Sequence, residues 1–201
     1  GRICPSCTKR QPCYHRPMPE SITPIAAAAP ASRALLADGA EQVFWETAST
    51  TEFETPVDRE MFQWRYFGYY LEREPELLFV ATEGDTVLGY ICGVADTRAH
   101  RELYEVAPHV AVFDDLYDRY PAHLHINLTA ASRGRGLGGR LVASLESAVA
   151  ARGAGGMHLV TSPGARNVRF YSRAGYVDAI TRPLAEGGEE AVSLLFLGKR
   201  L

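Results

Sequence analysis

The sequence predicts an α/β domain with a mixed, mostly antiparallel central sheet of about seven strands and helices on both of its faces. Residues 77–82 and 86–95 are apolar, branched and aromatic runs separated by Glu83-Gly84-Asp85, which is typical of an antiparallel hairpin. Between residues 124 and 161, a strand pattern, a helix pattern and a second strand pattern follow one another. This order favours a mixed sheet with helices packed on it.

The individual elements follow from periodicity and from helix start and stop signals. A first helix is expected from Ser32, a residue suited to an N-cap, and a second from Asp58 to a point before Pro75. The other expected elements are a helix over residues 97–106, a strand over 124–128, a helix over 136–152, a strand over 157–161, a short helix over 167–173 closed by Gly175, and strands over 176–181 and 191–197.

Composition restricts the class of protein. The chain has 201 residues, 46% of them hydrophobic and 22% charged, which suits one folded domain rather than a disordered or fibrous chain. The net charge of -3, with no contiguous basic face, argues against a nucleic-acid partner. No apolar run reaches the length of a membrane helix. We therefore expect a cytoplasmic protein with no membrane partner, as a monomer or homodimer.

The first 32 residues differ from the rest of the chain. Residues 1–32 hold much of the proline and an alanine tract, so we expect an N-terminal extension or a loosely attached first strand, followed by one domain over residues 33–201. Cys4, Cys7, Cys13 and His15 are enough ligands for zinc, but a single residue between Cys13 and His15 is a poor spacing. We predict no metal site and favour an oxidation-dependent disulfide or an unstructured tail.

A glycine-rich string joins a predicted strand to a predicted helix. Residues 132–140 read Ser-Arg-Gly-Arg-Gly-Leu-Gly-Gly-Arg, and apolar residues then recur every four positions from Leu137 to Val149. The free N–H groups of a helix's first turn and the helix dipole attract anions, and Arg133, Arg135 and Arg140 add positive charge. The expected ligand carries phosphate.

Three phosphate cradles compete for this string. A dinucleotide-binding fold needs an acidic residue at the end of the next strand, where this chain has Thr161-Ser162-Pro163. A nucleotide-hydrolase loop needs a lysine and a hydroxyl where this chain has Arg140 and Leu141. The third cradle, Arg-x-x-Gly-x-Gly from Arg133 to Gly138, resembles the pyrophosphate loop of the Gcn5-related N-acetyltransferase (GNAT) superfamily. An ordinary tight turn before a helix remains an alternative.

A second string strengthens the resemblance. Residues 167–176 read Asn-Val-Arg-Phe-Tyr-Ser-Arg-Ala-Gly-Tyr and resemble, in compressed form, the superfamily's Asn-x-x-Ala-x-x-Phe-Tyr-x-x-x-Gly-Phe region. The resemblance implies a GNAT fold, acetyl-coenzyme A as cofactor, and direct acetyl transfer to an amine on a small molecule or peptide. It implies that cofactor-binding residues are Leu128, Thr129, Arg133, Gly134, Arg135, Gly136, Leu137, Gly138, Gly139, Arg140, Asn167, Phe170 and Tyr171.

The chemistry of the transfer favours a phenol near the sulfur. The leaving thiolate is the conjugate base of a group with a pKa of about 8.5 or slightly above, and a tyrosine with a pKa near 10 can protonate it or hydrogen-bond to it. By resemblance this residue is Tyr171, although a core tyrosine fits the same helix pattern.

The strand before the loop supplies the other catalytic candidates. His123, His125 and Asn127 alternate with apolar residues and therefore share one face. In the superfamily the backbone near Leu128 binds the acyl carbonyl, and many members have a general-base glutamate where this chain has Ala122. A histidine could replace it, since its ordinary pKa is near 6.5. We predict His125 and Asn127 as catalytic residues, beside Tyr171, and His123 and Asp96 as substrate contacts. A structural role for the histidines and a helix-capping role for Asp96 are the alternatives.

Two further strings, over residues 89–98 and 120–128, resemble bacterial acetyltransferases related to the acetyltransferase-like C-terminal domain of O-GlcNAcases. This resemblance covers about residues 33–200. It leaves two functions open: an N-acetyltransferase, or a non-catalytic module that binds acetyl-coenzyme A. A dinucleotide-binding enzyme is a third, weaker alternative.

Overall fold

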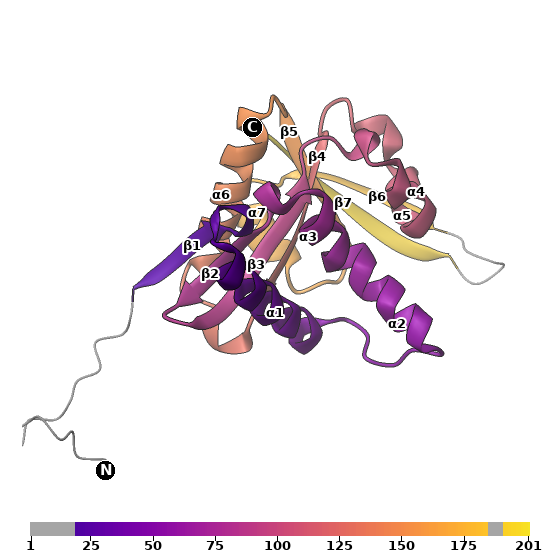
Figure 1. The fold of residues 1–201 in the computed structure, drawn as a ribbon. Coiled ribbons are helices and arrows are strands. Elements are labelled where there is room, and N and C mark those ends of the chain that lie inside the picture. Colours follow the sequence, from indigo (N-terminus) through magenta and orange to yellow (C-terminus); the bar gives the residue numbers. More distant parts are fainter. Residues whose placement is uncertain (1–18, 185–190) are drawn as a thin grey trace, which may run out of the picture.

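The computed structural model describes residues 19–184 and 191–201, which form a seven-stranded sheet with helices on both faces (Figure 1). The strand order is β1-β2-β3-β4-β5-β7-β6, and all neighbours are antiparallel except β4 and β5, which are parallel. The predicted α/β fold class is confirmed. The strands are β1 (Glu20–Pro24), β2 (Phe79–Glu83), β3 (Thr86–Val94), β4 (Ala122–Leu128), β5 (Gly156–Thr161), β6 (Asp178–Leu184) and β7 (Val192–Arg200).

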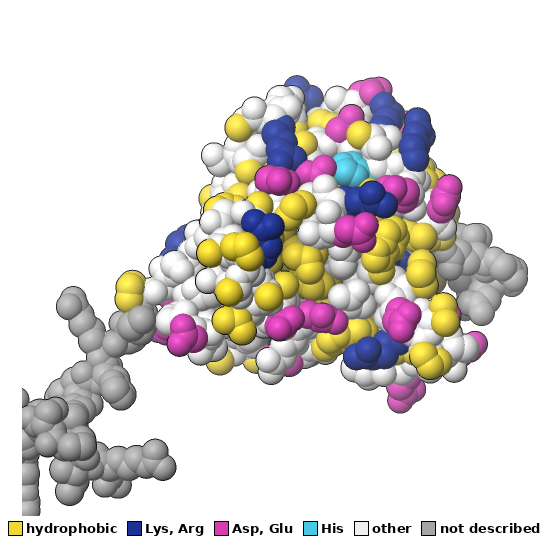
Figure 2. Space-filling view, viewed as in Figure 1, with side chains coloured by type: hydrophobic (Ala, Val, Ile, Leu, Met, Phe, Trp, Pro, Cys, Tyr) yellow, Lys and Arg dark blue, Asp and Glu magenta, His cyan; other side chains and the backbone are white. Residues whose placement is uncertain are grey.

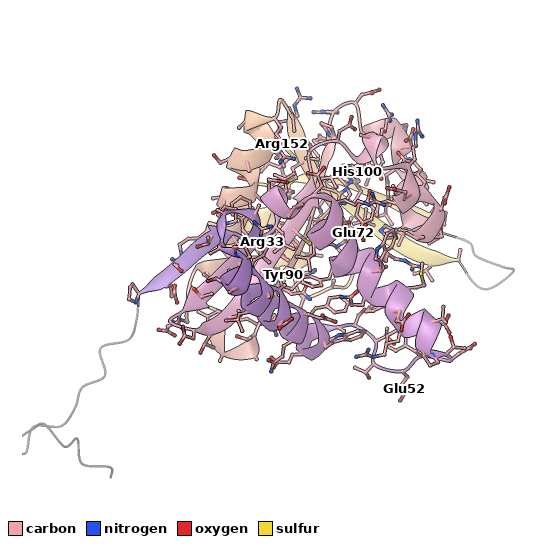
Figure 3. All side chains as sticks on the ribbon, viewed as in Figure 1. Arg33, Glu52, Glu72, Tyr90, His100 and Arg152 are labelled. Carbon is pink, nitrogen blue, oxygen red and sulfur yellow. The ribbon has the colours of Figure 1, made fainter. Side chains whose placement is uncertain are left out.

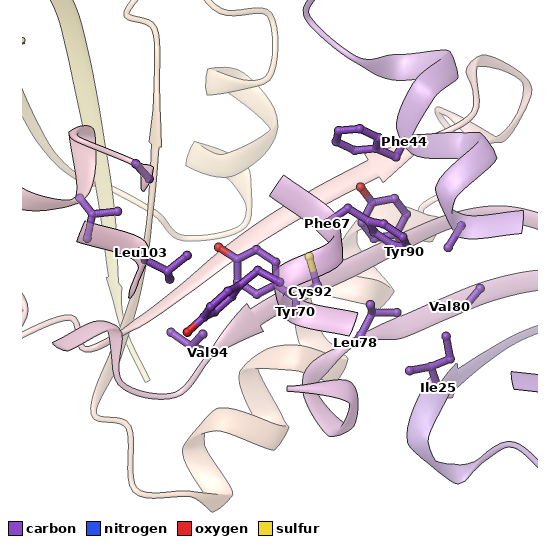
Figure 4. Close-up of a cluster of buried hydrophobic side chains, with 14 of the residues drawn as sticks. Ile25, Phe44, Phe67, Tyr70, Leu78, Val80, Tyr90, Cys92, Val94 and Leu103 are labelled. Carbon is purple, nitrogen blue, oxygen red and sulfur yellow. The ribbon is translucent and has the colours of Figure 1, made fainter. Parts of the chain in front are cut away.

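Two hydrophobic clusters lie on the two faces of the sheet. One cluster joins aromatic residues such as Phe44, Phe67 and Tyr90, and Figure 4 shows part of it. The other joins Leu141 and Leu145 to the opposite face. The helices packed on the first cluster are α1 (Pro30–Thr47), α3 (Tyr69–Arg73), α4 (Arg101–Val106) and α5 (His109–Val112), with α2 (Pro56–Gln63) at its edge; α6 (Leu137–Ala151) and α7 (Val168–Arg173) cover the second.

Local capping explains where the first helices differ from the sequence-based expectation. Helix α1 begins at Pro30, not after Ser32, because proline is well suited to the first helical position. Helix α2 begins at Pro56, because Thr55 and Asp58 form a capping box in which Asp58 is the third helical residue and not the cap. A π-helical turn then links α2 to α3.

The bounds of several strands differ from the expected ones because the strands pair with one another. Strand β4 begins at Ala122, because Ala122 and His123 pair with β5, and strands β6 and β7 extend to Leu184 and Arg200 by pairing with each other. The expected helix over residues 97–106 is a 3-10 turn followed by α4, and the short helix α5 lies in the connection before β4. Strand β1 pairs with β2 over its whole length, so residues 20–24 are part of the sheet.

Candidate active site

Strands β4 and β5 lie side by side only at their first residues. Ala122 pairs with Met157 and His123 with His158, and the pairing stops there, although β4 continues to Leu128 and β5 to Thr161. The two strands therefore diverge toward their carboxyl ends, and a split opens between them.

The backbone of β4 presents hydrogen-bonding groups to this split. Thr129 donates its N–H to the carbonyl of Leu88 at 3.0 Å. Because hydrogen-bonded pairs alternate along an antiparallel ladder, Leu128, which lies opposite Gly89, turns its own N–H and C=O away from β3. That side faces the split, as it does for Ile126. The strand register therefore turns the N–H of Leu128, a predicted cofactor-binding residue, toward the split.

The glycine-rich string forms an open cradle at the end of β4. Gly134 and Gly136 have φ of 78° and 76°, a left-handed conformation that favours glycine, and a Cβ added at either would meet no atom within 4 Å. The first N–H of helix α6 with a backbone partner is that of Arg140, which bonds to the Gly136 carbonyl at 3.3 Å. Among the described residues, the preceding N–H groups of residues 137–139 have no acceptor, so the helix start offers free donors to an anion.

Carboxylates on strands β1 and β2 form ion pairs with two of the loop arginines. Arg135 lies 2.5 Å from Glu20 and 3.5 Å from Glu83, and Arg140 also pairs with Glu20. Arg133 instead donates from Nε to the Leu128 carbonyl at 3.3 Å. The loop arginines are therefore held in place, and a phosphate ligand would compete with Glu20 for two of them.

Helix α7 brings the second predicted string against the first. A Cβ added at Gly138 would lie 3.2 Å from the Phe170 ring and 3.1 Å from the Leu128 side chain. The absence of a side chain at Gly138 thus lets α6, α7 and the end of β4 pack closely together. Three of the residues predicted from separate stretches of sequence meet at this point.

Tyr171 and Asn167, both in the string of residues 167–176, lie in different environments. Tyr171 is buried in the cluster beneath α6, and burial raises the pKa of its phenol above the ordinary value. Its hydroxyl donates to no protein atom in the described part of the chain. Asn167 is exposed and accepts a hydrogen bond from the Thr161 hydroxyl at 3.4 Å, at the end of β5.

The polar face of β4 carries one histidine with both ring nitrogens hydrogen-bonded and two further residues that line a cavity against α1. His123 is buried and uses both ring nitrogens, with the Tyr70 hydroxyl and the Thr97 hydroxyl each at 2.8 Å. These bonds favour its structural role over the predicted substrate contact. His125 and Asn127 instead line a cavity between the sheet and α1. Burial lowers the pKa of His125 to about 3, so it is neutral at physiological pH and a poor base for an ammonium group.

The remaining predicted residues are positioned mainly by local bonds. Asp96 is exposed and caps the following 3-10 turn, because its carboxylate accepts the N–H of Arg98 at 3.0 Å. Thr129 donates its hydroxyl to Ser132 at 2.9 Å, and the side chain of Leu137 is buried in the core. Asp96 therefore has the capping role that the sequence left as its alternative.

Two cavities meet at His125 on this face of the sheet. The first, which we call the aromatic cavity, has a volume of about 190 Å³ and is lined by the rings of Phe44, Phe62, Tyr66 and Tyr90 together with His125 and Asn127. The second, the histidine cavity, has a volume of about 30 Å³ and lies where β4 and β5 separate; its lining includes Arg65, Tyr66, His109, His123, His125 and His158. Tyr66 and His125 belong to both.

The sequence does not single out Arg65, Tyr66 or Tyr90 as site residues. Tyr66 fits the apolar periodicity of a helix, and Tyr90 lies in a long apolar run, so both patterns are typical of core residues. Their place at the cavities depends on how α1 and the π-helical turn pack on β3 and β4, and no local signal reveals that packing.

Comparison with known proteins identifies the family. The sequence model of the Acetyltransferase (GNAT) family matches residues 38–176, which include the cradle and helix α7. The chain belongs to this family. Its GNAT fold also resembles that of SsHAT, with 25% identity, a TM-score of 0.61, and coverage of 90% of this chain and 98% of SsHAT.

Two more distant structures share the fold. The yncA protein of Salmonella typhimurium, solved with its cofactor acetyl-CoA, is 18% identical with a TM-score of 0.57, over 90% of this chain and 94% of that one. The Drosophila melanogaster polyamine N-acetyltransferase, which forms N-acetylagmatine, is 14% identical with a TM-score of 0.59, over 91% of this chain and 100% of that one.

Residues 19–184 and 191–201 contain neither a membrane-spanning helix nor a cluster of metal ligands. No helix there combines the length and apolar character needed to cross a bilayer. In the same ranges, no three His, Cys, Asp or Glu side chains gather as metal ligands. Cys4, Cys7, Cys13 and His15 lie outside the described residues, so the predictions about them stay predictions.

Proposed function

We propose that this GNAT protein is an acetyl-coenzyme A-dependent N-acetyltransferase that transfers the acetyl group directly to an amine. The observation that carries the proposal is the split between β4 and β5, which ends at the cradle of free N–H groups before α6. Acetyl-coenzyme A would supply an acyl group activated as a thioester. The cradle fits its pyrophosphate, because the space beside Gly134 and Gly136 is empty and free donors face it.

The residues of this chain suit the transfer itself. In the balanced reaction the amine nitrogen bonds to the acyl carbon, the carbon–sulfur bond breaks with its electron pair on sulfur, and the ammonium gives up two protons, one to sulfur and one to water. The N–H of Leu128 points into the split, where it would stabilise negative charge on the acyl oxygen. The buried phenol of Tyr171 stays protonated because its pKa is raised, so it would donate a hydrogen bond to the departing sulfur.

Deprotonation of the amine requires no carboxylate base in this proposal. Ala122 is fully buried where many family members have a glutamate, and His125 has a low pKa. An ammonium that enters a buried site without a counter-charge loses stability relative to the free amine, so its pKa falls. Asn127 and neutral His125 would then accept hydrogen bonds from the amine and position it.

The absence of a glutamate at Ala122 and the low pKa of His125 also suit a second candidate function, a module that binds acetyl-coenzyme A without catalysis. Calorimetry with acetyl-coenzyme A, followed by a thiol-release assay over a panel of amines and peptides, separates the two functions. Binding with turnover supports the enzyme, binding without turnover on any acceptor supports the module, and no binding at low salt contradicts both. The narrower relation to the C-terminal domain of O-GlcNAcases stays a prediction.

A further inference from the structure

Two buried polar atoms near β4 have no hydrogen-bond partner. Among the described residues, only Arg65 Nε and the Tyr90 hydroxyl are buried side-chain nitrogen or oxygen atoms without one. Arg65 lines the histidine cavity and Tyr90 lines the aromatic cavity. A buried polar atom without a partner is destabilising, so its presence needs an explanation. Because both residues line adjoining cavities, a molecule bound there could supply the missing partners.

The aromatic cavity suits a ring that carries one polar substituent. Its volume of about 190 Å³ slightly exceeds the roughly 150 Å³ of an apolar cavity known to accept benzene. The Tyr90 side chain is fully buried, and its ring lies 5.0 Å from that of Phe67. Figure 3 places Tyr90 on the sheet next to α1, and Figure 4 shows its hydroxyl directed toward Phe44, which also lines the cavity. A hydroxyl on the bound ring would give this group its partner.

The mouth of the aromatic cavity lies between α1 and α2. Ser49, in the connection between these helices, is its one exposed lining residue. Figure 2 shows hydrophobic side chains gathered in the middle of this face of the molecule, with charged side chains around them. This exposed part of the lining is separate from the cofactor cradle, which lies at the start of α6.

The histidine cavity and the aromatic cavity differ in charge. No aspartate or glutamate lines either cavity within the described ranges, and Arg65 is the one lining residue that carries a full charge at neutral pH. Burial lowers the pKa of His109 and His158 to about 4, so these side chains are neutral. Nor does any described carboxylate lie within 4.0 Å of Arg65. The guanidinium would attract an anionic group and repel a second cation.

A neutral hydrogen-bond acceptor, Asn127, lines the aromatic cavity beside His125. The hydroxyl of Thr47 donates to the Val43 carbonyl at 2.7 Å, so it must accept the 2.7 Å bond from the Asn127 amide nitrogen. This fixes the amide orientation and leaves the Asn127 carbonyl oxygen available. His125 also lines the histidine cavity with Arg65, so an amine beside His125 and Asn127 would lie where the two cavities adjoin.

We infer that the acceptor is an aromatic α-amino acid, whose amine is acetylated, whose carboxylate binds Arg65 and whose ring occupies the aromatic cavity beside Tyr90. This inference rests on the proposed function and specifies its substrate class. It excludes polyamines and agmatine as preferred acceptors, because the site offers no carboxylate for their second positive charge.

Four acceptors separate the effects of the carboxylate, the ring hydroxyl and a second positive charge on acetylation. L-tyrosine and tyramine differ in the carboxylate, L-tyrosine and L-phenylalanine differ in the ring hydroxyl, and agmatine carries a second cation. We expect kcat/KM to be highest for L-tyrosine, about tenfold to a hundredfold lower for tyramine, and lowest for agmatine. Arg65→Gln should remove the difference between L-tyrosine and tyramine. Tyr90→Phe should remove the difference between L-tyrosine and L-phenylalanine.

The matched control is Arg59→Gln, which removes an arginine six residues earlier whose guanidinium lies over the Trp45 ring, outside both cavities. This variant should keep the wild-type order of acceptors. Calorimetric binding of L-tyrosine and tyramine to the free protein gives a second readout that is independent of turnover. Thermal unfolding of each variant checks that it is folded.

Equal or better use of agmatine, or equal effects of Arg65→Gln and Arg59→Gln, overturns the inference while leaving the proposed function intact. Failure of the proposed function has a different signature, since no amine is then acetylated. In that case the binding data decide. If the protein binds L-tyrosine more tightly than tyramine, and Arg65→Gln but not Arg59→Gln abolishes this preference, the amino-acid site is supported. Equal binding of the two compounds contradicts it.

Discussion

Replacement of Gly136 by leucine tests the placement of the cofactor cradle. Gly136 has a φ of 76° and a Cβ there would meet no protein atom within 4 Å, so strain is the only structural effect expected on folding. An L-residue in the left-handed region costs about 1–2 kcal/mol. In the proposed complex, however, the new side chain would occupy the space of the pyrophosphate.

The expected loss of affinity follows from the free N–H groups at the start of α6. A hydrogen bond to a charged group contributes about 1.5–3 kcal/mol, so displacement of the pyrophosphate from two backbone donors costs about 3–6 kcal/mol. This corresponds to a loss of about two to four orders of magnitude in the affinity for acetyl-coenzyme A. Calorimetry at low salt measures the affinity, and urea denaturation measures the free energy of unfolding.

Gly153 provides a matched control at the other end of the same helix. It has a φ of 89°, and a Cβ there would also meet no atom within 4 Å, but it lies after the last turn of α6 and far from the cradle. Gly153→Leu should therefore destabilise the fold by a similar amount and leave affinity for acetyl-coenzyme A unchanged. Equal affinities for Gly136→Leu and Gly153→Leu would refute the placement.

Three other predictions concern the phenol, the loop arginines and the buried histidines. Tyr171→Phe should lower kcat about tenfold to a hundredfold in a thiol-release assay and leave the Kd for acetyl-coenzyme A unchanged, because the phenol would serve the leaving sulfur; an unaltered rate contradicts this role. Glu20→Gln should tighten acetyl-coenzyme A binding about fivefold in calorimetry, since one competing carboxylate of about 1 kcal/mol is removed, and weaker binding would show that Glu20 instead positions Arg135 and Arg140. Burial lowers the pKa of His109 and His158 to about 4, below the unfolded value near 6.5, so the stability they contribute is present above pH 6.5 and falls as pH drops toward 4. Urea denaturation should show a loss of about 2 kcal/mol per histidine between pH 7 and pH 5, and equal stability at the two values would contradict the buried neutral state.

Features with a local cause could be predicted from the sequence. The alternation in β4 put His123, His125 and Asn127 on one face, and the four-residue spacing in α6 identified its buried side, because both patterns depend only on the geometry of one element. The glycine string predicted an open phosphate cradle, and the positive φ of Gly134 and Gly136 gives it a physical basis. Helix starts were less accurate, since a capping residue and a first-turn residue can both be an aspartate or serine.

Features that depend on how elements meet were decided only by the tertiary structure. The sequence by itself determined the fold class, the order of the elements and the backbone cradle. It could not show that both ring nitrogens of His123 are held by Tyr70 and Thr97, or that His125 lines both cavities, because the partners come from distant helices and turns. The placement of Arg65 and Tyr90 around the same strand likewise arises from the packing of the π-helical turn and β3. The proposed acceptor site is therefore a property of the assembled face, since side chains that look ordinary within their own elements line the cavities only when those elements pack together.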